Sequence, residues 1–221
     1  MEDRTMDRLA SIFIILLCVL AAAACSPNYA VDLDGQGDFV EIQSSRSLQP
    51  SSAITLEAWT LPSENASISL RQPILSKGRA PGSLSYALWF QNGEVAFELS
   101  GTGTVLKASS IVRADAPDRG SWHHIAGTWN RSQSLQRLFI DGILRAEGTT
   151  SFDAIAYDTS AQVFIGGQDS DGDNASDVEM NGQIDEVRVW SVARSPHEIQ
   201  VSMNQKLRGN EEGLEAYWQF D

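Results

Sequence analysis

The sequence predicts an all-β fold of two packed antiparallel sheets, with one short helix near the C-terminus. Stretches in which apolar and polar residues alternate recur along the chain, and Gly, Pro, Asn and Asp separate them. Two of these separators, Asn92-Gly93 and Asp141-Gly142, each stand between alternating runs, which is the strongest short-range signal of a β-hairpin. No internal repeat or second domain is evident, so the pattern indicates a single sandwich.

The N-terminal segment is expected to be an export signal rather than part of the fold. Residues 12–24 form an unbroken apolar run of 13 residues, which is too short to span a bilayer but typical of a signal-peptide core. Small residues lead from this run into Cys25, and the pattern resembles a bacterial lipobox. That resemblance implies removal of residues 1–24, lipidation of Cys25 and a tether over residues 25–28. Ordinary secretion and an uncleaved anchor are the alternatives.

Cysteine content and charge narrow the classes of protein further. The two cysteines are Cys18, inside the apolar run, and Cys25, so the folded domain has neither a thiol nor a disulfide. Its stability must come from core burial, with or without a metal ion. The net charge of −13 argues against nucleic acid as a partner, because that would require a basic surface. Acidity also suits a cation-binding exported protein, although solubility accounts for it equally well.

The predicted strands of the domain, residues 29–221, follow one another in order. Segments 29–33 and 39–42 flank the turn 34–38, where two glycines permit a tight backbone whose carbonyl groups can face one point. The next strands are expected at residues 54–61, 73–77, 85–100 (the first hairpin), 121–129, 135–145 (the second hairpin) and 163–166.

The next predicted strand carries a carboxylate of interest. Gly182 opens this strand, residues 183–190, in which period-two alternation places Asp185 on the same side as Val187 and Val189. A carboxylate on an apolar face is costly unless a cation or backbone N–H groups satisfy it. Asp185 is therefore a candidate for either role.

A short helix and a final strand complete the domain. Ser195 is the expected N-cap, Pro196 fits the first helical position, and Glu198 completes a capping box. Gly209 is the expected end of the helical element. An aromatic-rich strand over residues 214–220 closes the chain.

Five short runs carry a family resemblance: LDGQGDFV (33–40), WHHIAGTW (122–129), GQIDEVRVW (182–190), ARS (193–195) and GLEAYW (213–218). They resemble the laminin-G-like jelly rolls, which are concanavalin A-like lectin/glucanase sandwiches, in their bacterial form. The resemblance spans roughly residue 29 to the C-terminus. It implies a jelly-roll connection of the two sheets and a role in recognition, and it says much less about the ligand.

The resemblance also implies a structural calcium ion between the first turn and the closing strand. Asp34 and Asp185 would supply carboxylates, with a carbonyl from Gly37 or a neighbour. Calcium takes six to eight oxygen ligands, which a glycine-rich turn beside an inward carboxylate can offer. The alternative is that Asp34 caps its own turn and that Asp185 accepts backbone N–H groups.

A second calcium candidate is the acidic loop that follows residue 166. Residues 167–171 read Gly-Gln-Asp-Ser-Asp and resemble the pentraxin calcium loop Gly-Gln-Glu-Gln-Asp. The resemblance implies Asp169 and Asp171 as side-chain ligands and Ser170 as a carbonyl ligand. Pentraxins add an Asp-Asn pair from an earlier loop, and residues 80–83 hold no carboxylate in its place. A solvated acidic turn that binds calcium weakly is the alternative.

No arrangement of residues predicts catalysis. The Glu-x-Asp-x-x-Glu strand of the family-16 glucanases is absent, and Asp185 and Glu186 are adjacent, so we expect them on opposite faces. Nucleophile-elbow, metalloprotease and phosphate-loop motifs are absent as well. Trp89 and Trp129 are the candidate aromatic platforms for a sugar, and the alternative is that both fill the core.

The sequence therefore predicts a non-catalytic, calcium-stabilised module that binds a glycan or a surface protein. We expect it on a bacterial cell envelope, in contact with the membrane only through the lipid on Cys25. The alternatives are a structural envelope lipoprotein without a soluble ligand and, more remotely, a glycan-active enzyme on the same sandwich.

Overall fold

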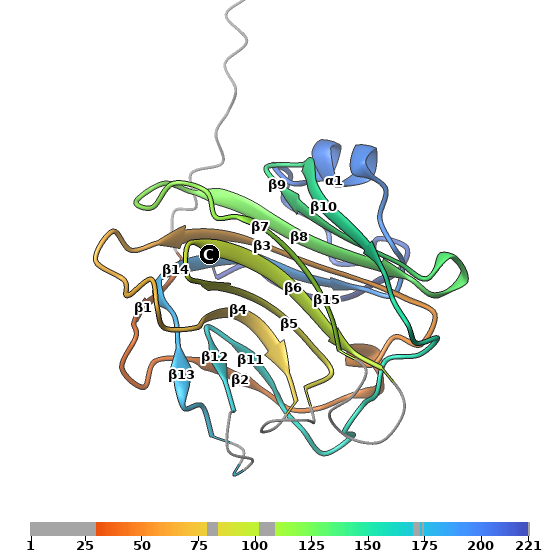
Figure 1. The fold of residues 1–221 in the computed structure, drawn as a ribbon, viewed down its shortest axis with the longest axis horizontal. Helices are drawn as coiled ribbons and strands as arrows, with labels where there is room; N and C mark the ends of the chain where they lie inside the picture. The colour runs from red at the N-terminus through yellow and green to blue at the C-terminus, as the bar shows by residue number, and fades with distance from the viewer. Residues whose placement is uncertain (1–29, 79–83, 102–108, 170–172, 174, 221) are drawn as a thin grey trace, which may run out of the picture.

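The computed structural model describes residues 30–78, 84–101, 109–169, 173 and 175–220. Within them two antiparallel sheets lie face to face, with one short helix outside the layers, as the sequence predicts (Figure 1). The predicted signal and tether, residues 1–28, lie outside the described residues, as do Ser170 and Asp171. None of the helices in the described part is long and apolar enough to cross a membrane.

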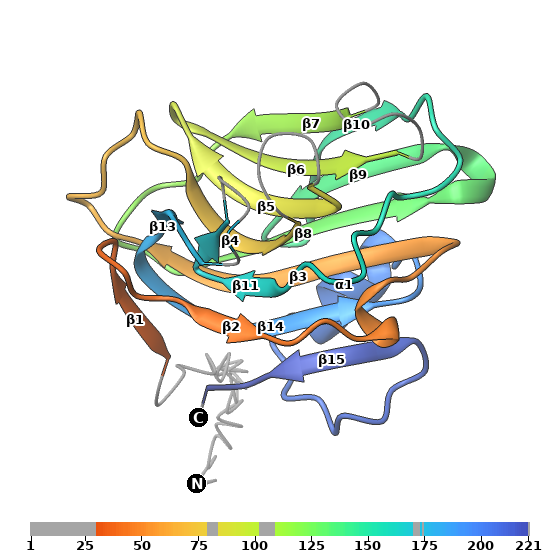
Figure 2. The ribbon, with the colours of Figure 1, turned by 90° about the horizontal axis from the view of Figure 1, so that it is seen from below.

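The first layer is a seven-stranded sheet in the order β1-β14-β3-β8-β9-β10, with β15 also paired to β14. Its strands are β1 (Val31–Asp34), β3 (Ala53–Pro62), β8 (His123–Asn130), β9 (Leu135–Ile140), β10 (Ile143–Thr149), β14 (Asn181–Trp190) and β15 (Leu214–Trp218). β1 pairs with the first half of β14 and β15 with the second half. These two strands therefore lie end to end along one side of β14 (Figure 2).

The second layer is a six-stranded sheet in the order β2-β11-β4-β5-β6-β7. Its strands are β2 (Val40–Ile42), β4 (Gln72–Lys77), β5 (Tyr86–Gln91), β6 (Glu94–Ser100), β7 (Ser109–Asp115) and β11 (Val163–Ile165). The short pair β12 (Gly167–Gln168) and β13 (Val178–Glu179) lies beside β4. One apolar core fills the space between the layers, with Leu56, Phe97 and Trp129 at no measurable exposure.

Both predicted hairpin turns are confirmed. Asn92 and Gly93 join β5 to β6 with φ of 54° and 79°, and Asp141 and Gly142 join β9 to β10 with φ of 52° and 71°. Positive φ at both central residues is the type I′ geometry, whose twist matches that of the flanking strands.

A β-bulge in β14 changes the direction of its side chains. Asp185 pairs with Trp59 of β3, but the next paired residue is Arg188, opposite Glu57. Two residues of β14 thus face a single residue of β3, and Glu186 takes a positive φ of 52°.

The bulge overturns the predicted orientation of Asp185. Val187 and Val189 belong to the core between the sheets, whereas Asp185 points to the side of its partner Trp59, away from the core. The expectation that Asp185 shares a face with the two valines is wrong, because the extra residue resets the period-two alternation.

The helix begins as predicted and ends earlier. α1 (Pro196–Ser202) starts at the Ser195 N-cap, and the capping box with Glu198 is complete. The expected extension toward Gly209 is wrong. Donors from the sheet take the carbonyls that further turns would use: Arg188 bonds to Ser202 O (3.1 Å) and Gln205 O (2.8 Å), and Trp59 bonds to Met203 O (2.7 Å).

Candidate functional site

The outer face of the six-stranded sheet carries a row of residues across its three last strands. Trp89 of β5 pairs with Ala96 of β6, which in turn pairs with Arg113 of β7. Because the middle residue is only an alanine, the Arg113 side chain can reach over the Trp89 ring, 5.4 Å from its centroid. Arg71, which precedes β4, lies over the same ring at 4.3 Å. Two guanidinium groups therefore share one indole.

Two carboxylates complete this group of charges. Glu98 Oε2 accepts hydrogen bonds from Arg71 Nη2 (2.9 Å) and Trp89 Nε1 (3.1 Å). Glu94 Oε2 lies 3.7 Å from Arg113 Nε. We call Arg71, Trp89, Glu98 and Arg113 the arginine–tryptophan patch. It has a rigid base, since Glu98 ties the indole and one arginine together.

The two arginines retain unused hydrogen-bonding capacity. Burial lowers the pKa of Arg71 and Glu98 opposes that shift; a guanidinium stays charged at neutral pH in either case. Arg71 Nε has no hydrogen-bond partner within the structure. The Arg113 side chain is 43% exposed and the Arg71 side chain 23%. Planar N–H donors are thus available at the surface to an incoming acceptor.

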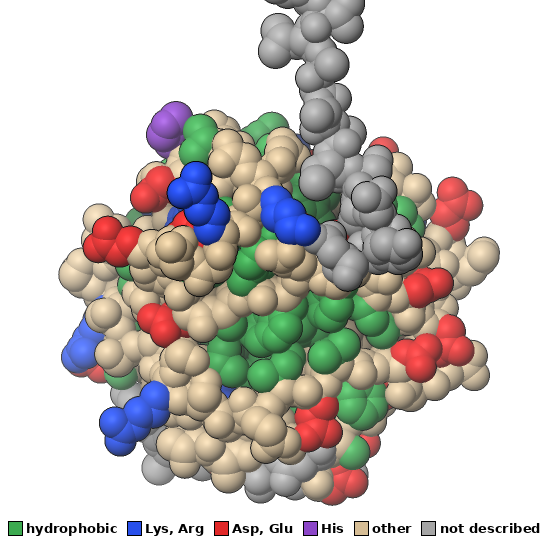
Figure 3. All heavy atoms as spheres, turned by 180° about the vertical axis from the view of Figure 1, so that it is seen from behind, with side chains coloured by type: hydrophobic (Ala, Val, Ile, Leu, Met, Phe, Trp, Pro, Cys, Tyr) green, Lys and Arg blue, Asp and Glu red, His purple; other side chains and the backbone are tan. Residues whose placement is uncertain are grey.

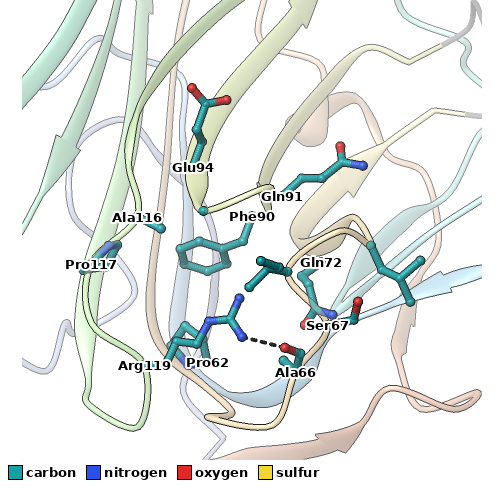
Figure 4. Close-up of a pocket in the computed structure, with 13 residues that line it drawn as sticks. Pro62, Ala66, Ser67, Gln72, Phe90, Gln91, Glu94, Ala116, Pro117 and Arg119 are labelled. Carbon is teal, nitrogen blue, oxygen red and sulfur yellow. Dashed lines mark hydrogen bonds between the residues drawn. The ribbon is translucent and has the colours of Figure 1, made fainter.

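A pocket adjoins the patch at the end of the sandwich (Figure 4). Its empty volume is about 360 Å³, including space open to solvent, and Phe90 lies among its walls. This rim pocket is lined by Pro62, Ala66, Ser67, Ile68, Leu70, Gln72, Phe90, Gln91, Gly93, Glu94, Ala116, Pro117 and Arg119. Glu94 belongs to the pocket and also pairs with Arg113, so the pocket and the patch are continuous.

The loop that covers the rim pocket is fixed by hydrogen bonds and exposes apolar side chains. Arg119 Nη1 donates to Ala66 O, as the dashed line in Figure 4 shows, and Gln91 Nε2 donates to Ser69 O at 3.1 Å. Ile68 and Leu70 are 59% and 62% exposed. A ligand at the patch would therefore meet apolar surface at one end.

The two tryptophans that the sequence singled out differ in position. Trp129 is fully buried between the sheets, and its Nε1 donates to Thr150 Oγ1 at 3.1 Å, so its candidacy as a sugar platform is wrong. Trp89 does face outward, but only 3% of it is exposed because arginines lie over its ring. It supports Arg71 and Arg113 instead of presenting an open aromatic face.

The first predicted calcium site is not assembled. Asp34 pairs with Asn181, four residues before Asp185 along β14, which is roughly 13 Å at the rise of a strand. Asp34 Oδ1 accepts from Gln36 N in its own turn, and Asp185 Oδ1 accepts from Glu186 N, both at 2.7 Å. These contacts match the alternative reading of both residues, and Asp34, Gly37 and Asp185 do not fit one ion. Burial raises the pKa of Asp185 to about 6.

The second predicted calcium site lies only partly within the described residues. Asp169 is 1% exposed, whereas its expected partners Ser170 and Asp171 are outside them. Among the described residues there is no group of three His, Cys, Asp or Glu that could hold a metal ion. Calcium in this loop remains a prediction.

A buried ionic cluster lies on the other outer face, beneath α1. Glu57 at the middle of β3 is fully buried; its Oε1 is 3.0 Å from Arg194 Nη1, and its Oε2 is 3.2 Å from His124 Nε2 and 3.7 Å from Arg188 Nη1. Burial alone would raise the pKa of Glu57, but the nearby His124, Arg194 and Arg188 hold it below its ordinary value. The cluster has no route to a ligand and serves to fasten the helix to the sheet.

Sequence reasoning missed both arginines and this cluster. Glu98 was interpreted as an ordinary exposed hairpin residue, yet its side chain is only 13% exposed. A charged residue in the middle of the apolar run 54–58 could have indicated a covered outer face at Glu57. No sequence signal links Arg71 to Arg113, because they meet only across three strands.

Comparisons with known proteins agree with this architecture. The laminin G model of the concanavalin A-like lectin/glucanases superfamily matches residues 34–200. A curated relative, the rat "Sushi, von Willebrand factor type A, EGF and pentraxin domain-containing protein 1", is 30% identical over 91 residues, which are 40% of this chain and 3% of that protein. The chain thus spans only a small part of this relative.

Solved structures with the same fold include carbohydrate-binding domains. The sialidase CBM40 of Ruminococcus gnavus, bound to α2,3-sialyllactose, superposes with a TM-score of 0.65 at 18% identity over 78% of this chain and 95% of that one. A putative carbohydrate binding protein of Bacteroides ovatus gives 0.58 at 19% over 87% and 49%. A pentraxin of Limulus polyphemus gives 0.59 at 14% over 85% and 88%. The chain belongs to the concanavalin A-like lectin/glucanases superfamily, in its laminin G branch.

Proposed function

We propose that this domain binds an acidic carbohydrate at the arginine–tryptophan patch and the rim pocket. The observation that carries the proposal is the pair Arg71 and Arg113 held over one indole, with donors open to solvent. A guanidinium presents two parallel N–H groups that match a carboxylate or sulfate. The carbohydrate-binding neighbours, one of them with sialyllactose, support this choice of ligand class.

The proposed role is recognition without catalysis. A glycosidase needs one carboxyl group that can donate a proton and a second that acts as nucleophile or base. At the patch Glu98 is held by Arg71 and Trp89, and Glu94 lies beside Arg113. Both carboxylates are thus paired with cations, which favours their ionised forms and suits positioning of the arginines better than proton transfer.

Replacing Arg71 or Arg113 by alanine is expected to weaken binding of acidic glycans by roughly ten- to a hundredfold each, since each change removes charge-assisted hydrogen bonds. A glycan array followed by calorimetry on the best acidic ligand measures this. Arg137→Ala is the matched control, because Arg137 is also a strand arginine paired with a glutamate, on the seven-stranded sheet. Unchanged affinity in both patch variants, or equal binding of the uncharged analogue, contradicts the proposal.

We propose further that calcium binds the loop around Asp169. Millimolar calcium is expected to raise the thermal midpoint by several degrees, because an ion that binds only the folded state stabilises it. Asp169→Asn should abolish this shift in a thermal melt with calcium against chelator. Asp34→Asn is the control and should keep it, because Asp34 bonds only within its own turn and to Asn181. A shift lost in Asp34→Asn and kept in Asp169→Asn would contradict the assignment.

The proposed cellular setting is the bacterial envelope, with a lipid on Cys25 as the anchor. The run of apolar and small residues that ends at Cys25 supports this setting. The anchor would leave the arginine–tryptophan patch free, because β5, β6 and β7 lie at the far end of their sheet from β2.

A further inference from the structure

One side of the sandwich exposes part of the apolar core. On the opposite side β7 and β10 contact each other and close the layers. Here the layers end at β2 and at β1 with β15, and side chains between these strands are packed on the core but remain partly accessible. We call this set the apolar edge; it consists of Val31, Val40, Ile42, Ala216, Trp218 and Phe220.

Figure 3 shows this side as a continuous apolar surface in the middle of the molecule, with acidic side chains along one flank. Figure 2 agrees that β1, β2 and β15 lie together at one margin of the fold. A contiguous apolar area of this kind marks a contact surface. Trp218 and Phe220 add aromatic rings, and tryptophan in particular is enriched where protein meets the lipid headgroup region.

We infer that the apolar edge rests on the lipid bilayer to which Cys25 is anchored. The length of the tether carries this step: six residues lead from Cys25 to Val31, a member of the edge, and they span at most about 20 Å. A lipid on Cys25 therefore holds this edge, rather than the patch or α1, next to the membrane. The inference rests on the anchor proposed above.

Attachment by the tether is necessary, because the domain alone has little affinity for a membrane. Its net charge of −13 opposes approach to anionic lipids, and the exposed Asp32 and Glu41 stand on the edge strands. The tether replaces this weak affinity with a high local concentration at the bilayer surface. The edge then fixes the orientation, which leaves the arginine–tryptophan patch directed away from the lipid.

Tryptophan fluorescence in vesicles with brominated lipids tests this orientation. The full chain is expressed, the membrane form is purified, and it is reconstituted into phosphatidylcholine vesicles brominated near the headgroup. We expect quenching in the anchored protein and loss of at least half of that quenching in Trp218→Phe. Trp122→Phe, which removes another partly buried tryptophan beside β8, should retain it. No quenching, or equal quenching in Trp218→Phe, overturns the inference.

Two further measurements separate the anchor, the edge and the glycan site. Mass spectrometry of the membrane form should find a lipid on Cys25, and an unmodified Cys25 overturns the inference because the tether is then absent. Light scattering of the Cys25→Ser protein should give a monomer. A dimer that Trp218→Glu dissociates would assign the edge to a second copy and also overturn it. Glycan affinity should be unchanged in Trp218→Phe, so failure here is distinguishable from failure of the proposed function.

Discussion

Replacing Glu57 by glutamine is expected to lower the free energy of unfolding by about 3–5 kcal/mol, because removal of one partner leaves buried cations without a counter-charge. Arg188 and His124 are fully buried, and the Arg194 side chain is 10% exposed. Arg194 also bonds to Ser202 Oγ and Glu198 O of α1, so the helix should loosen together with the cluster. Chemical denaturation at neutral pH measures the loss.

Acidification should shrink the difference between the wild type and Glu57→Gln. The folded-state pKa of Glu57 lies below its ordinary value. Its ionised form therefore stabilises the protein above the ordinary pKa, and this stabilisation is lost as the pH falls through the folded-state pKa.

A matched variant is available on the open face of the same sheet. Glu147 pairs with Arg137 at 3.1 Å, but its side chain is 53% exposed, so Glu147→Gln should cost less than about 1 kcal/mol. Equal effects of the two substitutions would show that Glu57 has no special role.

Replacing Trp129 by alanine is expected to destabilise the domain by about 3–5 kcal/mol, because it removes a fully buried indole and leaves a cavity between the sheets. The ring packs near Phe152, with centroids 6.1 Å apart, and its N–H bonds to Thr150. Urea denaturation measures the loss. At temperatures where the variant is still folded, glycan affinity should match that of the wild type.

Trp122→Ala is the control for Trp129→Ala. Trp122 is only partly buried and lies outside the strands, so its loss should cost much less. Weakened glycan binding by folded Trp129→Ala protein would restore Trp129 to the ligand site.

Local signals in the sequence were sufficient for the turns and the helix start. A type I′ turn depends on the backbone freedom of Asn92 and Gly93, and a capping box depends on Ser195 and Glu198. These interactions span a few residues, so the sequence shows all their participants. The family motifs likewise lie in short continuous runs, which is why the sandwich could be predicted.

Features that depend on distant strands could not be predicted. The bulge at Glu186 arises from the pairing of β14 with β3 and not from any unusual residue. Alternation therefore placed Asp185 on the wrong face, and the calcium site built on that orientation does not assemble. The arginine–tryptophan patch depends on Ala96 lying between Trp89 and Arg113. Such a relation follows from the strand register, which the sequence does not show.

The arrangement of β1 and β15 along β14 has a consequence for proteolytic trimming. Each covers a different half of β14, with pairs such as Val31 to Ile184 and Trp218 to Val187. Loss of either strand would bare half of β14 as a run of unpaired backbone groups. An exposed strand of this kind is a template for self-association. Clipped forms should therefore accumulate as aggregates, so the last few residues at each end of the fold protect its solubility.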